Sequence, residues 1–119
     1  LEEVIAEGEK GNEDCRIAAG VYINRLKLYL GGYYWMMDGA DAVVFTDSVG
    51  THSWKLHEMV CGSVQHLGIR LDRQKNRLSP PDAERFVQAP GSAVHLLVIP
   101  TDEQSVILKE VIRADREGR

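Results

Sequence analysis

The chain has 119 residues, of which 44% are hydrophobic and 27% are charged, and its net charge is −4. These values are ordinary for one globular domain that buries its own core. The negative charge argues against a nucleic-acid-binding protein, because contact with a phosphate backbone needs a basic face. No apolar run approaches the roughly 18–20 residues that span a bilayer, and no signal-peptide pattern appears, so we expect a cytoplasmic protein without a membrane partner.

The chain begins with two helical segments. Residues 1–11 form a short acidic pattern that stops at a glycine. Asn12 is a favourable helix N-cap, and the acidic residues that follow it suit the positive end of the helix dipole. Apolar residues then recur at steps of three and four as far as Asp38-Gly39, which predicts one long helix with an apolar face.

Two features of this long helix predict its surroundings. Ile17, Val21 and Leu28 lie beside the apolar face, so we expect the helix to be buried on more than one side. The pair Gly31-Gly32 costs helix stability, which a close contact with another helix or with a sheet would explain.

A second long helix is expected between Ser53, which can act as its N-cap, and Gly68, which can end it. Its expected inner face consists of Leu56, Met59, Val60, Val64 and Leu67. Cys15 and Cys61 form no C-x-x-C pair, and both have apolar neighbours. We therefore expect two small buried thiols in a reducing compartment.

Two apolar runs, Ala42 to Thr46 and Val94 to Ile99, predict buried strands. We expect further short strands at Ile69–Asp72 and Arg85–Gln88, the second within residues 73–93, the least ordered part by composition. A last helix begins at Thr101 with a capping box. This order of elements predicts an α/β fold in which the two hydrophobic strands are central in the sheet.

The polar loop 47–52 follows the first hydrophobic strand and precedes a helix, which is where α/β proteins bind phosphates and nucleotides. Such a loop needs small residues, yet only Gly50 is a glycine, and Asp47 places negative charge near any anionic ligand. Neither a Walker pattern nor a G-x-G-x-x-G pattern is present. The residues alone favour an ordinary strand-to-helix turn and leave a nucleotide loop as the alternative.

Glu103 follows the second hydrophobic strand, in the first turn of the last helix. A carboxylate there serves the helix dipole and the cap, or it is a ligand for a hard metal ion, directly or through water. None of the four histidines forms a helical i,i+4 pair, so their spacing supports no metal site. His52 in the loop is either a polar residue at a helix N-terminus or a catalytic one, whereas His57 and His66 look like helix-surface residues.

The end of the long helix carries a dense group of aromatic and methionine residues, in the sequence Tyr33-Tyr34-Trp35-Met36-Met37. This composition is typical of a core or a subunit interface and is less typical of a cofactor site.

Four stretches in order resemble the acetate and propionate kinase family, whose members are carboxylate kinases of the actin and sugar-kinase superfamily. The family's long helix has an Arg-x-x-x-Tyr-hydrophobic-Gly-x-Tyr pattern, which is met here by Arg25, Tyr29, Leu30, Gly31 and Tyr33. The other matching stretches are GADAVVFT at 39–46, VCGSVQHLGIRLDRQKN at 60–76 and LVIPTDE at 97–103. Together they cover nearly the whole chain.

The resemblance implies a nucleotide site in the loop. The family loop reads Gly-Gly-Ile-Gly-Glu-Asn-Ser, and Val49, Gly50 and Ser53 keep that pattern here. Asp47-Ser48 replace the leading glycines and Thr51-His52 replace Glu-Asn. The implied nucleotide-binding residues are Ser48, Val49, Gly50, Thr51 and His52. Glu103 matches the metal-associated glutamate of the family, and Asp102 stands where the family has Asn.

The resemblance also implies a fold and a function. It predicts that residues 1–119 form a single ribonuclease H-like lobe, the C-terminal lobe of a longer two-lobe protein that uses ATP or ADP with Mg²⁺. The family's acetyl-phosphate site and its catalytic residues lie in the missing N-terminal lobe, so we expect no catalytic residue in this chain. The first residue, Leu1, agrees with a piece of something longer. The alternatives are a non-catalytic dimerisation or interaction module and a nucleotide-sensing domain.

Overall fold

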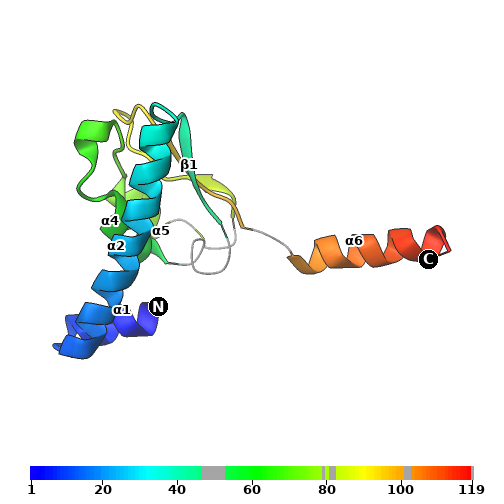
Figure 1. Cartoon of the computed structure of the whole chain (residues 1–119), viewed down its shortest axis with the longest axis horizontal. Helices are drawn as coiled ribbons and strands as arrows, with labels where there is room; N and C mark the ends of the chain where they lie inside the picture. Colours follow the sequence, from blue (N-terminus) through cyan, green and yellow to red (C-terminus); the bar gives the residue numbers. More distant parts are fainter. Residues whose placement is uncertain (47–52, 79, 81–82, 101–102, 119) are drawn as a thin grey trace.

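The computed structural model describes residues 1–46, 53–78, 80, 83–100 and 103–118 (Figure 1). Its helices are α1 (Glu2–Glu9), α2 (Glu13–Met36), α4 (Trp54–Cys61), α5 (Arg73–Leu78) and α6 (Glu103–Arg116), with a 3-10 turn η1 (Gln65–Leu67). Its strands are β1 (Ala42–Phe45), β2 (Arg85–Phe86) and β3 (His95–Val98). Helices and strands are mixed along the chain, and the two main strands are separated by helices, so the expected α/β class is confirmed.

The three strands form one sheet in the order β1-β3-β2. The two hydrophobic strands β1 and β3 are parallel neighbours, and β2 pairs antiparallel with β3. The central position that we expected is correct for β3, whereas β1 lies at one edge of the sheet that the described strands form. The other expected short strand, Ile69–Asp72, is reduced to a single bridge between Leu71 and Gln88.

Helices α2 and α4 pack on one face of the sheet (Figure 1). Because side chains alternate along a strand, Phe45, Leu96 and Val98 point into this layer and are buried. From the helices, Ile23, Leu56 and Val60 complete the core. Burial of apolar area between the two layers is the main stabilising contribution.

The long helix α2 has the ends that its sequence predicts. The Asn12 side chain accepts a hydrogen bond from the Cys15 backbone N–H at 3.1 Å, as an N-cap does. At the other end Asp38 and Gly39 adopt positive φ angles of 58° and 96°, and the Gly39 N–H donates to Tyr34 O at 2.8 Å. A left-handed backbone with glycine is a common way to end a helix.

The surroundings predicted for α2 are wrong for this chain. Ile17, Val21 and Leu28 are exposed, and Leu28 is 77% exposed, so the helix buries one face only. A methyl group added at Gly31 or Gly32 would meet no atom within 4 Å outside its own helical surroundings. No contact within the described residues therefore explains the two glycines.

The second helix is shorter than we expected. It ends at Cys61, where Gly62-Ser63 interrupt a weak helical pattern, and η1 follows as a separate turn before Gly68. Leu67, expected on the inner face, is largely exposed. Helix α5 was missed altogether, although Asp72 caps it by accepting a hydrogen bond from the Lys75 N–H at 2.9 Å.

Helix α6 follows β3 and extends away from the rest of the molecule (Figure 1). Among the described residues, no helix has the length and apolar character needed to cross a membrane.

Candidate functional site

The carboxyl ends of β1 and β3 lie side by side. The parallel register pairs Phe45 with Val98, and the Ile99 N–H donates to Phe45 O at 2.9 Å just beyond the strands. The segment 47–52 leaves from β1, and α6, which begins at Glu103, follows β3. The two segments predicted to bind nucleotide and metal therefore both start at the carboxyl ends of these neighbouring strands. Ligand sites of α/β folds form at that end of the sheet.

The predicted nucleotide-binding residues Ser48, Val49, Gly50, Thr51 and His52 lie outside the described residues. The backbone of Glu103 is described as the first residue of α6, but its side chain is not. The roles of all six residues stay predictions. Among the described side chains, no three of His, Cys, Asp or Glu gather closely enough to hold a metal ion.

The helix that follows the loop begins as predicted. Ser53 is buried, and its hydroxyl oxygen accepts a hydrogen bond from the Leu56 N–H at 3.2 Å. This cap satisfies one of the free N–H groups at the start of α4.

His57 is the main site residue that the sequence analysis misplaced. We expected a helix-surface residue, but its side chain is fully buried, and its ring lies 4.4 Å from the Phe45 ring, centroid to centroid. Its Nδ1 lies 2.7 Å from Oδ1 of the buried Asn76 on α5. The Asn76 amide nitrogen donates to Trp54 O at 2.9 Å, so Oδ1 is the acceptor, and we assign the proton of this bond to His57 Nδ1.

The spacing of the buried residues along α4 could have predicted that His57 is buried. The buried face of the helix runs at steps of three and one through Ser53, Leu56, His57, Val60 and Cys61. A histidine within such a face is a core residue, provided that a partner accepts or donates its hydrogen bond. Asn76 is that partner, and it comes from a helix that the sequence analysis did not predict.

An ion pair and a cation–π contact link the outer surfaces of α4 and α5. The Arg77 guanidinium donates to both Glu58 carboxylate oxygens, at 2.7 and 2.9 Å, and lies 4.7 Å from the centre of the Trp54 ring. The hydrogen bond from Arg77 is the main reason that the pKa of Glu58 lies below its ordinary value. Such bidentate pairs are stronger than single ion pairs.

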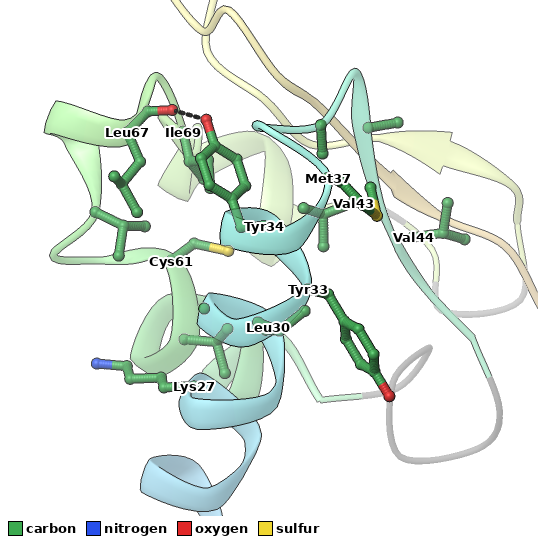
Figure 2. Close-up of a pocket in the computed structure, with 15 residues that line it drawn as sticks. Lys27, Leu30, Tyr33, Tyr34, Met37, Val43, Val44, Cys61, Leu67 and Ile69 are labelled. Atoms are coloured by element: carbon green, nitrogen blue, oxygen red, sulfur yellow. Dashed lines mark hydrogen bonds between the residues drawn. The ribbon is translucent and has the colours of Figure 1, made fainter.

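A cavity of about 370 Å³ lies between α2, β1 and the segment around η1 (Figure 2). Apolar side chains line most of it, among them Leu30, Val43 and Ile69. The Tyr34 hydroxyl closes one side by donating to Leu67 O at 2.7 Å. Lys27 and Tyr33 also line the cavity, but its mostly apolar lining suits an apolar group.

Cys61 also lines this cavity, and burial raises the pKa of its thiol to about 11. The expectation of a buried thiol is confirmed for Cys61 and is wrong for Cys15, which is partly exposed.

The aromatic and methionine residues at the end of α2 form no core. Tyr33, Trp35, Met36 and Met37 are exposed, and Tyr34 is the member that packs against the core. An interface at this end of α2 stays a prediction.

A sequence model of the acetokinase family matches residues 1–109. The chain belongs to the acetokinase family. It is 33% identical over 118 residues to an acetate kinase of Bacillus cytotoxicus, a match that covers 99% of this chain and 29% of that protein. It is 39% identical over 105 residues to an acetate kinase of Dictyoglomus turgidum, covering 88% of this chain and 25% of that protein.

Solved structures agree with the sequence relatives. The chain superposes on the crystal structure of acetate kinase from Entamoeba histolytica with a TM-score of 0.83 and 33% identity, covering 92% of this chain and 29% of that one. For acetate kinase from Porphyromonas gingivalis the TM-score is 0.80 with 32% identity, covering 94% of this chain and 28% of that one. The family resemblance and the actin and sugar-kinase type of fold are thereby confirmed. The chain spans less than a third of the length of these acetokinase relatives.

Proposed function

We propose that this acetokinase chain is the C-terminal nucleotide-binding lobe of an acetate or propionate kinase-like protein of the cytoplasm. The complete protein would transfer a phosphoryl group from ATP to a short carboxylate. The observation that supports this most is the parallel register of β1 and β3, in which Phe45 pairs with Val98. Because of this register, the loop 47–52 and the segment before Glu103 follow neighbouring strand ends. One ligand bound at that position could contact both segments.

In this proposal residues 48–52 bind the nucleotide, and Glu103 holds Mg²⁺ directly or through water. When it is bound, Mg²⁺ neutralises phosphate charge during transfer. Ser53 and the His57–Asn76 pair fix the first turn of α4, where the loop ends. The acceptor site and the catalytic residues belong to an N-terminal lobe, carried on the same polypeptide or on another.

The test is a calorimetric titration of the chain with ADP and Mg²⁺, repeated with Glu103→Ala. We expect saturable binding that the substitution weakens by about tenfold or more, because a charge-assisted metal contact is lost. Glu110→Ala is the matched control, since Glu110 is an exposed carboxylate on the same helix.

The titrations of the unchanged chain and of Glu103→Ala test nucleotide binding and the metal role of Glu103 separately. Equal affinity of the unchanged chain and Glu103→Ala would remove Glu103 from the metal site. Absence of binding by the unchanged chain would overturn the nucleotide-binding function.

A second candidate function is a non-catalytic dimerisation or interaction module. The observation that favours it is the exposed apolar stripe of α2, which consists of Ile17, Val21, Leu28 and Trp35. These residues lie at steps of four and seven, the spacing of a helix seam. If this function is correct, Leu28→Asp lowers the association measured by sedimentation equilibrium, whereas a chain that stays monomeric at high concentration contradicts it.

A further inference from the structure

The cavity between α2, β1 and the segment around η1 is larger than the voids of a packed core. Its volume is about 370 Å³. Protein interiors are packed as densely as organic crystals, and they leave few voids larger than a water molecule. Pockets that bind small molecules, by contrast, have volumes of roughly 300–1,000 Å³. The volume of this cavity therefore lies in the range of ligand sites.

Most of the cavity lining is apolar. Val60, Cys61 and Ile69 are buried, and Leu30 and Val43 are partly buried and pack against the core (Figure 2). A cavity lined in this way stays dry and takes up apolar molecules, as an engineered cavity of about 150 Å³ takes up benzene. The part of a ligand that lies between α2 and β1 is therefore a hydrocarbon.

A single positive charge stands at one end of this lining. Lys27 lines the cavity, and Figure 2 shows its nitrogen at the outer edge of the lining side chains. The ammonium group lies 3.4 Å from Ser63 Oγ. None of the described lining residues is acidic, and Lys27 forms no ion pair with a described carboxylate. Charge complementarity therefore favours a ligand with an anionic head group at this end.

Gly31 leaves one side of the cavity without a side chain. It belongs to the lining, whereas its neighbour Gly32 is not among the described lining residues. A Cβ atom added at Gly31 would meet no atom within 4 Å outside its own helical surroundings. A glycine inside a helix costs stability relative to alanine. Open space beside the cavity is a use for Gly31 that no packing contact in the described chain supplies.

The volume sets the size of the ligand. Benzene, with its six carbon atoms, fits a cavity of about 150 Å³, which is about 25 Å³ for each atom. At that ratio, 370 Å³ holds roughly 15 non-hydrogen atoms. A medium-chain fatty carboxylate such as decanoate is within this limit, and butyrate is too short to fill the cavity.

We propose that this cavity binds a medium-chain fatty carboxylate. Its alkyl chain lies between α2 and β1, and its carboxylate accepts hydrogen bonds from Lys27 Nζ and Ser63 Oγ. The proposal goes beyond nucleotide binding and uses neither the loop 47–52 nor Glu103.

The first test locates the alkyl chain. The full chain is titrated calorimetrically with decanoate below the concentration at which decanoate forms micelles. We expect saturable binding, which Gly31→Leu weakens by about tenfold or more because the new side chain occupies part of the cavity. Gly32→Leu is the matched control and should leave the affinity unchanged. Both glycines have open space around them, so we expect folded variants, which far-ultraviolet circular dichroism checks.

The second test identifies the head group. The unchanged chain should bind decanoate about threefold or more tightly than decanol, because solvent screens but does not cancel the attraction to the partly exposed Lys27. Lys27→Met keeps an apolar stem and removes the charge, so it should abolish this preference and leave decanol binding unchanged. Butyrate, which has the same head group and a short chain, should bind at least tenfold more weakly than decanoate.

A third measurement uses the two cysteines as reporters. Cys61 lines the cavity, whereas Cys15 lies on α2 outside its described lining. Decanoate should slow the reaction of Cys61 with methyl methanethiosulfonate and should not change the reaction of Cys15. Mass spectrometry of peptides measures the two modifications separately.

Three outcomes overturn the proposal. Absence of decanoate binding by the unchanged chain excludes the ligand. Equal affinities of Gly31→Leu and Gly32→Leu, with Cys61 unprotected, place the alkyl chain elsewhere on the molecule. Equal affinities of the unchanged chain for decanoate and decanol exclude recognition of the carboxylate by Lys27.

Discussion

At the scale of single residues, the hydrogen bond between His57 and Asn76 joins α4 to α5 beneath the carboxyl end of β1. Both side chains are buried, and the Asn76 amide also donates to Trp54 O. Buried polar groups are costly when they lose their partners, so this pair makes the packing of the two helices specific.

We expect Asn76→Leu to lower the free energy of unfolding by about 2–4 kcal/mol, because His57 Nδ1 and Trp54 O both lose a buried partner. Urea unfolding measures the change. Asn24→Leu on the exposed side of α2 is the control and should change stability by less than about 0.5 kcal/mol. Equal effects of the two substitutions would contradict the role assigned to the pair.

At the scale of elements, α5 is held to α4 from both sides. The His57–Asn76 pair lies inside, and the Arg77–Glu58 pair lies outside, where Arg77 is half-exposed. The short helix α5 has few apolar residues of its own, so these polar contacts fix its position. A helix of this length is marginal without tertiary contacts.

Arg77→Met should lower the free energy of unfolding at neutral pH only slightly, because solvent screens the half-exposed guanidinium. The folded pKa of Glu58 lies below its ordinary value of 4.5, so the pair stabilises above that pH. The contribution disappears as the pH falls through the lowered folded pKa. Unfolding at a series of pH values should therefore show the two proteins converging in acid. Arg113→Met removes an exposed ion pair with Glu110 on α6 and should not change the free energy of unfolding measurably.

The glycines of α2 allow a second prediction at this scale. Gly31→Ala and Gly32→Ala should each stabilise the chain by roughly 0.5–1 kcal/mol, because alanine favours the helix and the added methyl group meets nothing within 4 Å. Gly39→Ala should destabilise it, since Gly39 has a φ of 96°. Thermal unfolding measures all three. Destabilisation by Gly31→Ala would reveal a close contact absent from the described chain.

At the scale of the whole molecule, the chain corresponds to one part of the longer acetokinase fold, and it exposes many large apolar side chains. It spans less than a third of the length of its acetokinase relatives. Within the described residues, the apolar stripe of α2 is exposed, β1 lies at an edge of the sheet, and Val44 and Phe86 are exposed on the sheet itself. Exposed apolar surfaces of this kind mark contacts with other protein elements.

We expect the chain alone to transfer no phosphoryl group from ATP to acetate or propionate, because the catalytic residues of our proposal belong to the other lobe. Trapping of acyl phosphate with hydroxylamine measures this activity. The acetate kinase of Dictyoglomus turgidum, assayed in parallel, is the positive control. Turnover by the purified chain would contradict the assignment of catalysis to a second lobe.

The sequence by itself determined the local features, because their causes lie within a few residues. The Asn12 and Ser53 caps, the Asp38-Gly39 helix end and the two hydrophobic strands follow from side-chain chemistry and short-range spacing. Four ordered motifs were also enough to identify the family.

Only the tertiary structure decided which surfaces are covered, because that depends on contacts between residues distant in the chain. His57, which we expected on the surface, is buried and hydrogen-bonded to Asn76, 19 residues away in the chain. The apolar stripe of α2, by contrast, is exposed. The tertiary structure also placed β1 at an edge and aligned Val44, Leu97 and Phe86 on one face of the sheet. An apolar residue favours burial wherever it occurs, but the fold determines whether a neighbour is present to bury it.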